Sequence, residues 1–558
     1  MVGCRAESVP ATGTASTLRS SVPVFPFPSR FESAPTRLPG AVVLLASLGV
    51  FVSSAWRLAR AVAASANSDS LYLAGMYRDL FVDYVPIKAW HTQPAPSFFP
   101  DLPVFFLLRA LTGQATVALG AYAVVGLLLG VLVIVAIARL LEVEGRVAVW
   151  SAAFLAMGAL AYVDSFGDFF HLCFAPSCHG SCVWVSAGCA LLIARQIKAR
   201  RFSTVSALGV LVVTALTRAS DNEYVLYAAG LGLALVFSML VARTVRTLLA
   251  LNLVAIGLGN HYFDKPAKIY DWLGMTVEPY PPSIEFTWKR VTHTLELLPP
   301  PEGQLSVLFL NTAALVISFA IAFAVCGIVA ARFHPERRQN TALLGFFAST
   351  AVGIFCCVFF GMAFSGGYWN DWSGRYLQAL IVVPYLVLPV AWLVAQRWAL
   401  RGALVAMFAA VLYKKGAPET SEKMTPLLAD SAVYPAANAC IDDIARRYGV
   451  RFGYGDYWYA RRTTELSRAG LRVLPVSHAI TANTWIANKA TFAAAASAPS
   501  FLVVMPSLDE GVVRGRFGPP SKVESCQGCP ATGYSNSGGC ENEPIWVYSA
   551  PPRSRVLP

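Results

Sequence analysis

The sequence predicts a polytopic α-helical membrane protein that ends in a small α/β domain. The chain has 558 residues, of which 56% are hydrophobic and only 14% are charged. Its mean hydropathy is +0.54. A water-soluble protein of this length carries far more charge. From about residue 430 the composition changes to that of a soluble domain, so we expect a separate C-terminal unit at 430–558.

Long apolar runs predict the membrane spans. We expect about eleven, several of them short: 39–56, 114–138, 147–163, 181–194, 203–217, 224–241, 247–260, 305–330, 341–364, 376–395 and 401–413. The membrane domain then covers 39–415 and carries two long loops, 57–102 and 261–304. Residues 1–38 are rich in Ser, Pro and Arg and predict a disordered cytoplasmic tail.

The charge of the loops predicts the orientation. Basic residues gather in 195–201, 243–246, 332–338 and 396–401, and the alternate short loops nearly lack them. The positive-inside rule therefore places the N-terminus in the cytoplasm, and both long loops and the tail outside. In a membrane chain, the formal charge of +12 suggests basic cytoplasmic loops of this kind. Since no nucleic-acid-binding motif is present, nucleic acid is not an expected partner.

The C-terminal unit predicts a small α/β domain on the outer side. The segments "ACIDDIARRYG" and "YWYARRTTELSRAG" predict helices, the second ending at Gly470, and "LRVLPV", "FLVVMP" and "PIWVYS" predict strands. Four cysteines predict two disulfides in an oxidising compartment, with the pairing open: Cys440, Cys526, Cys529 and Cys540. A zinc knuckle is the less common alternative.

The segment "NSDSLYLAGMYRDLFVDY" (67–84), just after the first span, predicts an amphipathic helix at the membrane surface. Its apolar band consists of Tyr72, Leu73, Met76, Leu80 and Phe81. Asp69 lies near the start of this helix. A carboxylate at that position either caps the helix by accepting backbone N–H groups or takes part in proton transfer, and spacing alone leaves both open.

This first loop resembles the GT-C glycosyltransferases, in particular the lipid A aminoarabinose and protein mannosyl members. The resemblance spans 69–109 and rests on Asp69, "LAGMYRDL", Trp90 and "PAPSFFPDLPVFF", which follow the family's order. Ser70 stands where the family usually has a second acidic residue. The resemblance implies a multi-span enzyme that moves a sugar from a polyprenyl-phosphate carrier. It also implies that Asp69 acts on the acceptor hydroxyl, as the general base or as its orienting group.

Two further pairs of polar residues are candidate substrate ligands. Asp164 and Asp168 lie four apart, so a continuing helix places both on one face. There they would orient the acceptor, bind a divalent cation, or only mark the water boundary. Arg375 and Tyr376 open a Pro-containing late span, as in GT-C enzymes. This resemblance implies that Arg375 pairs with the carrier phosphate, and an interfacial anchor is the alternative.

The remaining candidates precede the fourth and sixth spans. The segment "HLCFAPSCHGSC" (171–182) is dense in zinc-ligand residues, although outside the cytoplasm a disulfide among its cysteines is commoner. Within it, His179 is a candidate phosphate contact. Asp221 is expected on the same side as Asp69, as a substrate ligand or as the cap of span six in a solvated hairpin. A divalent cation is the one cofactor that these residues suggest, and whether a metal is required stays open.

These observations favour an inverting GT-C-like glycosyltransferase in the bacterial inner membrane, with its C-terminal domain in the periplasm. Its expected partners are a polyprenyl-phosphate-linked sugar donor, a glycan, lipid or protein acceptor, and membrane lipids. A transporter or flippase is one alternative, which predicts ionisable residues within the spans and internal repeats. A catalytically inactive scaffold of the same fold is the other. The polar candidates gather at the outer ends of the spans, which favours the enzyme.

Overall fold

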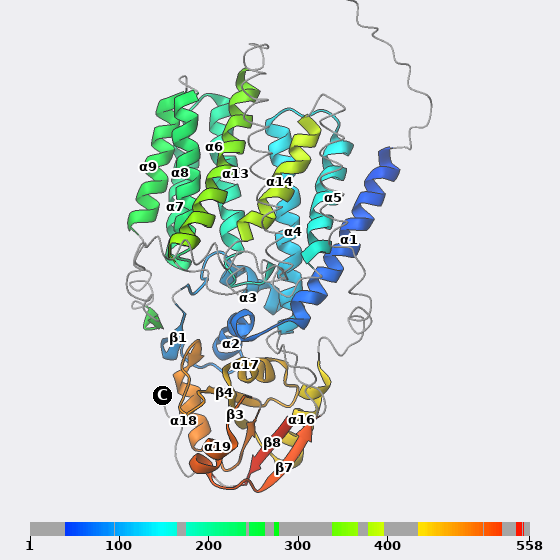
Figure 1. Ribbon diagram of the computed structural model, residues 1–558, viewed down its shortest axis with the longest axis vertical. Helices are drawn as coiled ribbons and strands as arrows, with labels where there is room; N and C mark the ends of the chain where they lie inside the picture. The colour runs from blue at the N-terminus through cyan, green and yellow to red at the C-terminus, as the bar shows by residue number, and fades with distance from the viewer. Residues whose placement is uncertain are drawn as a thin grey trace, which may run out of the picture.

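The computed structural model describes residues 40–93, 95–164, 174–241, 245–262, 273–277, 338–365, 378–394, 434–505, 507–526, 543–549 and 551. These residues form a bundle of apolar helices and a C-terminal α/β domain, with short elements between the two (Figure 1). The predicted tail 1–38, most of the loop 261–304, and the predicted spans 305–330 and 401–413 lie outside the described residues.

The described helices of the bundle coincide with the other predicted spans. They are α1 (Gly40–Ala64), α4 (Ala115–Leu140), α5 (Arg146–Asp164), α6 (Ser181–Ala199), α7 (Thr204–Ser220), α8 (Tyr224–Val241), α9 (Arg246–Tyr262), α13 (Arg338–Ser365) and α14 (Gln378–Val394). Four are long and apolar enough to cross a membrane: α1, α4, α6 and, over Ala342–Met362, α13. Shorter apolar helices lie within α5, α7, α8 and α14. The structure therefore supports a helical membrane protein with several candidate spans.

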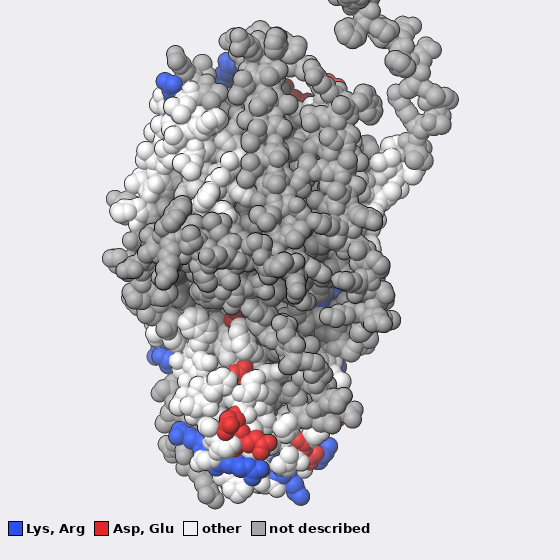
Figure 2. Space-filling model, viewed as in Figure 1, with Lys and Arg blue, Asp and Glu red and all other residues white. Residues whose placement is uncertain are grey.

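The outer surface of the bundle is apolar. Large exposed side chains there include Leu45, Val52, Trp56, Leu132, Val205, Leu240 and Val254. In Figure 2 the described surface over these helices shows almost no charge in this view, whereas both signs gather on the α/β domain. An apolar surface of this extent is unfavourable in water and is expected of helices that face lipid.

Inside the bundle, small residues allow two helices to touch along their backbones. Gly230 of α8 faces α13, where a Cβ on Gly230 would lie 2.5 Å from the backbone of Ile354. No side chain fits at that distance, so glycine is required there. Close approach of this kind is a common way to pack helices in lipid, where no hydrophobic effect drives their association.

The α/β domain contains a five-stranded sheet in the order β4-β3-β6-β8-β7. Its strands are β3 (Phe452–Asp456), β4 (Arg472–Val476), β6 (Phe501–Val504), β7 (Lys522–Cys526) and β8 (Glu543–Tyr548). The first three run parallel, and the last two join antiparallel. The helices are α16 (Ala436–Tyr448), α17 (Tyr457–Leu466), α18 (Lys489–Ala496) and α19 (Glu510–Phe517). The two predicted helices and three predicted strands are all present.

One predicted boundary is wrong. Helix α17 ends at Leu466, not at Gly470. Ser467 leaves the helical conformation, and its hydroxyl donates to the buried carboxylate of Asp442 at 2.6 Å. The backbone N–H groups of Arg468 and Ala469 donate to the same carboxylate. Asp442 thus supplies the partners that end the helix early, because buried backbone groups must be hydrogen-bonded.

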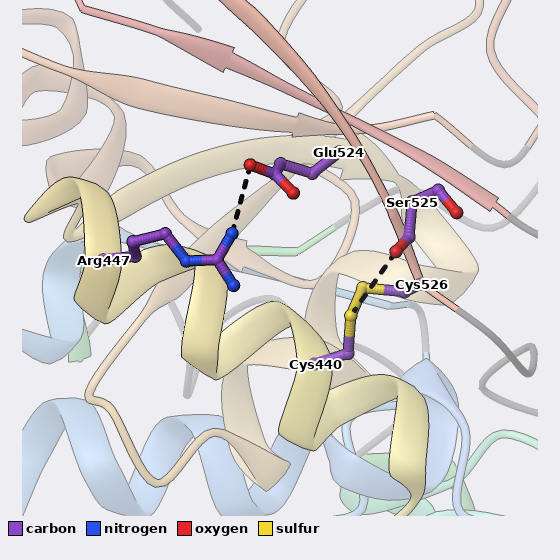
Figure 3. Close-up of a disulfide and its surroundings, with 5 residues drawn as sticks. All are labelled: Cys440, Arg447, Glu524, Ser525 and Cys526. Atoms are coloured by element: carbon purple, nitrogen blue, oxygen red, sulfur yellow. Dashed lines mark hydrogen bonds and ion pairs between the residues drawn. A yellow bond between two sulfur atoms is a disulfide. The ribbon is translucent and has the colours of Figure 1, made fainter.

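One of the two predicted disulfides is present, between Cys440 and Cys526 (Figure 3). It joins α16 to the edge strand β7. The Arg447 guanidinium donates to Glu524 on the same strand at 3.2 Å. Cys529 and Cys540 lie outside the described residues.

Helix α2 (Ser68–Phe81) connects the two parts of the chain. It lies between the bundle and α17 (Figure 1). The Ser68 hydroxyl donates to the carbonyl of Tyr457 at 2.5 Å, and Arg78 Nη1 donates to the carbonyl of Thr464 at 3.0 Å. The predicted helix is confirmed, but its polar side does not face water. Helix α17 covers that side, so most of α2 is buried.

A small second sheet strengthens this junction. Its order is β2-β1-β5, from β1 (Trp90–Thr92), β2 (Thr276–Val277) and β5 (Ala487–Asn488). The first long loop therefore pairs with the α/β domain through β1 and β5, and the second long loop joins the sheet by pairing β2 with β1. Contacts of this kind fix the position of the domain over the bundle.

We predict that Arg472→Ala loosens the junction. Arg472 Nη2 lies 2.9 Å from Asp79 and also pairs with Asp83, and Arg472 and Asp79 are largely buried. Removing one partner of a buried pair costs about 3–5 kcal/mol, and we expect at least about 2 kcal/mol here because Asp83 is partly exposed. Hydrogen exchange along α2 and α17 measures the free energy of local opening.

Arg446→Ala is the matched control, because Arg446 pairs with Asp443 on the exposed surface of α16. Exposed pairs of this kind contribute little to stability because water and salt screen them. Equal effects of the two substitutions, or unchanged exchange in Arg472→Ala, would show that this ion pair does not hold the junction.

Candidate functional site

A cavity of about 480 Å³ opens where α2 meets the α/β domain. The membrane part contributes Asp69 and Gln93, and the α/β domain contributes Asp456, Tyr457, Trp458, Val476, Ser477, His478, Asn483 and Trp485. Each part of the chain thus supplies one carboxylate. The cavity combines these with amide and hydroxyl groups and two indole rings, which is a lining suited to a polar ligand with an apolar face.

The sheet positions the α/β side of this cavity. Asp456 is the last residue of β3, and Val476 is the last residue of β4. These are the carboxyl ends of neighbouring parallel strands, the edge at which α/β sheets bind their ligands. The Asp456 carboxylate accepts the backbone N–H of Trp458 at 3.0 Å and so caps α17. The cap fixes the carboxylate and directs the start of α17 toward α2.

Asp69 does not cap α2, so the capping interpretation is wrong, and its part in proton transfer stays a prediction. The cap is Asn67, whose side chain accepts the N–H of Ser70 at 2.9 Å. Ser70 in turn accepts the N–H of Asn67, which completes a capping box. Ser70 therefore has a structural role at the position where the GT-C family usually carries a second acidic residue.

The half-buried carboxylate of Asp69 is held from the α/β domain. The Tyr457 hydroxyl donates to Asp69 Oδ1 at 2.6 Å. From the bundle, Ser177 Oγ donates to the Asp69 carbonyl at 2.8 Å. Asp69 lies in the first turn of α2, where the helix dipole favours a negative charge. The geometry gives a carboxylate of fixed orientation that reaches the cavity.

The other residues of the first-loop motif position these groups. Trp90 is buried in β1 beneath the Arg461 guanidinium, whose carbon lies 5.2 Å from the ring centre. Arg78 pairs with Asp83 at 3.3 Å. The backbone N–H of Phe99 donates to the Ser220 hydroxyl at 2.8 Å, which ties the Pro-rich segment to the end of α7.

A buried polar layer lies next to the cavity on the bundle side. Asp101 begins α3 (Asp101–Thr112) and accepts hydrogen bonds from the Tyr122 hydroxyl at 2.5 Å and from the Ser177 N–H at 3.1 Å. Burial raises the pKa of Asp101 from 3.8 to about 6, although these hydrogen bonds oppose the shift. Through Ser177, Asp101 is connected to the backbone of Asp69.

His179 and Asp221, both predicted site residues, contact each other. His179 Nδ1 lies 2.7 Å from Asp221 Oδ2, and Nε2 lies 3.4 Å from Glu223 Oε1. Burial raises the pKa of Asp221, but the charge and hydrogen bond of His179 outweigh it and hold that pKa below its usual value. The contact of His179 with a phosphate stays a prediction.

The expected solvated hairpin at 217–224 is wrong. Asp221 and Glu223 are buried, and the His179 ring contacts both carboxylates. Asp221 Oδ1 accepts the N–H of Glu223 at 2.9 Å just before α8, as the predicted cap would. The residue thus combines a local structural role with its ion pair to His179.

The remaining predicted site residues are not described. Asp164 is the last residue of α5, and its side chain lies outside the described residues, as do Asp168, Arg375 and Tyr376. Whether Arg375 reaches Asp69 is therefore outside what the structure describes. Among the described residues, no group of three or more His, Cys, Asp or Glu side chains can hold a metal ion. No disulfide joins Cys178 to Cys182, which are both buried.

Sequence reasoning missed Asp456, Trp458, Trp485 and Asp101 as site residues. Asp456 follows "FGYG", whose two glycines are unfavourable in a strand, so the buried strand was not predicted. The signal for it was an acidic residue between a short strand and a predicted helix, a frequent position for a ligand-binding side chain. Nothing local distinguishes Trp485, because only the tertiary fold brings it to the cavity.

No model of a known protein family matches the chain, and no curated protein matches its sequence. Function therefore has to be argued from the site itself, since a fold alone does not define an activity.

We predict that Asp101→Asn makes stability less dependent on pH. The folded protein holds the Asp101 proton more tightly than the unfolded chain, so stability falls as pH rises from about 4 to about 6, and stays low above that. A shift of this size corresponds to about 3 kcal/mol. Asparagine carries no charge to bury and removes this loss.

Thermal unfolding of both proteins in lipid nanodiscs from pH 4 to pH 7.5 measures the difference. Other titrating groups contribute equally to both curves and cancel. Parallel curves would contradict the assignment of a burial-raised pKa to Asp101.

Proposed function

We propose that the chain is an inverting membrane glycosyltransferase of the GT-C kind, which transfers a sugar from a polyprenyl-phosphate carrier to an acceptor hydroxyl. One observation carries the proposal: the Asp69 carboxylate, held by Tyr457, reaches a cavity between a membrane-anchored helix and the α/β domain. A lipid-linked donor and a water-soluble acceptor can meet only at such a boundary.

In the proposed reaction, Asp69 acts as general base. Its carboxylate takes the proton of the acceptor hydroxyl as that oxygen attacks the anomeric carbon. The new carbon–oxygen bond forms as the bond to the carrier phosphate breaks, and the bonding electron pair leaves with the phosphate. The hydrogen bond from Tyr457 holds the carboxylate in one orientation, which reduces the cost of reaching the reactive geometry.

The donor would approach Asp69 from the bilayer. Arg375, with Tyr376 beside it, is proposed to hold the carrier phosphate as its charge grows. Asp164 and Asp168 are proposed to orient the substrates. A divalent cation is not needed for the single displacement proposed here, since Asp69 supplies the base and Arg375 the charge stabilisation.

The proposal includes eleven spans in a bacterial inner membrane, a cytoplasmic N-terminus and a periplasmic α/β domain. It is supported by the position of α2, β1 and α17 at one end of the bundle (Figure 1). At the other end, Lys198 in the basic segment 195–201 pairs with Glu142 at 3.0 Å. The segments that the loop charges assign to one side are thus in contact with one another.

The composition of the described bundle helices does not favour a transporter. They contain no Asp or Glu except Asp164, the last residue of α5. Transport of ions or charged lipids typically requires ionisable groups within the spans. Apart from Glu142 and Glu144 at the opposite end, the described acidic residues of the membrane part instead gather at the end of the bundle that faces the α/β domain, which favours chemistry at that surface.

We predict that Asp69→Asn abolishes transfer. Loss of a general base costs about 100- to 10,000-fold in rate, and Tyr457→Phe should cost less because the carboxylate remains. A deletion strain that expresses wild type or a variant at equal levels provides the test, and mass spectrometry of the cell-envelope glycans provides the readout. The missing glycan should return with wild type and not with Asp69→Asn.

Asp443→Asn is the control, since Asp443 is an exposed carboxylate on α16. It should restore the glycan fully. Full complementation by Asp69→Asn would remove Asp69 from the mechanism, and unchanged glycans in the deletion strain would contradict the proposed activity.

A further inference from the structure

The lining of the cavity indicates which substrate it takes. Asp69 and Asp456 bring two carboxylates, and the described lining contains no Lys or Arg. The two arginines that follow Trp458 on α17 are directed elsewhere. Arg461 lies over Trp90 and donates to the Ile486 carbonyl, and Arg462 donates to the Ala66 carbonyl at 3.1 Å.

A phosphate, sulfate or carboxylate group would therefore meet like charge in the cavity. Like charges in direct contact repel each other near a protein surface. This argues against the lipid phosphate of the donor and against an anionic acceptor. The cavity instead suits an uncharged ligand with hydroxyl groups, which donate hydrogen bonds to carboxylates without bringing a charge.

Two indole rings add an apolar surface. The Trp458 ring packs edge-on against Tyr457, with 4.9 Å between the ring centres. The backbone N–H of Trp485 donates to Asn483 Oδ1 at 3.1 Å. This hydrogen bond forms a local turn that fixes where the Trp485 side chain leaves the loop. The C–H face of a sugar ring carries partial positive charge and packs favourably on the electron-rich face of an indole. The same ring presents hydroxyl groups at its edge, and the cavity offers Asp456, Gln93 and Ser477 to them.

The size of the cavity agrees with such a ligand. Its volume of about 480 Å³ falls within the range of about 300–1,000 Å³ that small-molecule sites occupy. This gives room for a mono- or disaccharide and leaves none for a folded protein surface. An extended peptide could still enter, so peptide binding is one outcome of the test below.

We propose that this cavity is the acceptor site and that it binds the terminal sugar of an uncharged saccharide. The sugar ring stacks on Trp485, and Asp456 accepts its hydroxyl hydrogen bonds. Its reactive hydroxyl points toward Asp69. This orientation of the hydroxyl rests on the proposed glycosyl transfer. The α/β domain thus selects the acceptor, and the donor phosphate is excluded to the membrane side of Asp69.

A glycan array tests binding without catalysis. Full-length protein in lipid nanodiscs is applied to neutral and acidic mono- to tetrasaccharides and to Ser/Thr-rich peptides. The wild type should retain neutral glycans. Trp485→Ala should lower their affinity about tenfold or more, the loss expected for one aromatic contact, whereas Trp485→Phe should keep most of it.

Trp56→Ala is the matched control, because Trp56 is exposed on α1 and does not line the cavity. It should bind like the wild type. Binding only of acidic glycans or of peptides, absence of any bound glycan, or equal binding by Trp485→Ala and wild type would each overturn the proposal.

Asp69→Asn separates this inference from the proposed activity. Neutral-glycan binding by Asp69→Asn together with loss of envelope transfer supports both. If Asp69→Asn restores the envelope glycan while neutral glycans still bind, the transfer proposal fails and the acceptor site stands. If transfer requires Asp69 but no neutral glycan binds, the acceptor proposal fails alone.

Discussion

The docking of α17 on α2 is the contact on which the candidate site depends. Ser68 and Arg78 on α2 donate to backbone carbonyls of α17, and Arg472 pairs with Asp79 and Asp83. These bonds are largely buried, so each group would lose its partner if the two parts separated. The docking brings Asp456 and Asp69, far apart in sequence, to one cavity. Without it, Asp69 would be an isolated carboxylate at the membrane surface.

The polar layer beneath the cavity explains how the bundle supports this geometry. Ser177 bonds to both Asp101 and the backbone of Asp69, so the first turn of α2 is held from the bundle as well as from the α/β domain. Asp101 and Asp221 are both buried, but the pKa of Asp101 is raised and the pKa of Asp221 is lowered. Among the described residues, the donors to Asp101 are neutral, whereas Asp221 has a histidine partner. The difference follows from the partner and not from the burial, which both share.

The sequence predicted what depends on local pattern. Apolar length predicted the bundle helices, and the position of Asp69 after the first span directed attention to α2. Cys440 was predicted in a disulfide, with its partner left open, since spacing does not define pairing. The strand β3 was not predicted because "FGYGD" lacks β-branched residues. Its burial comes from the neighbouring strands β4 and β6. Tyr457 was placed on a helix correctly, but its bond to Asp69 bridges 388 residues of sequence, and no local pattern contains such a contact.

We propose that Asp69 faces a cavity on the outer side, where the membrane part and the α/β domain meet. The most direct measurement is the labelling of full-length Asp69→Cys by a membrane-impermeant maleimide, in intact spheroplasts and in inverted vesicles, corrected for labelling of the unsubstituted protein. The account predicts reaction at position 69 in spheroplasts only, and reaction of Arg201→Cys, on the basic side, in inverted vesicles only. Labelling of position 69 from the cytoplasmic side, or no reaction from either side while Arg201→Cys reacts, would contradict it.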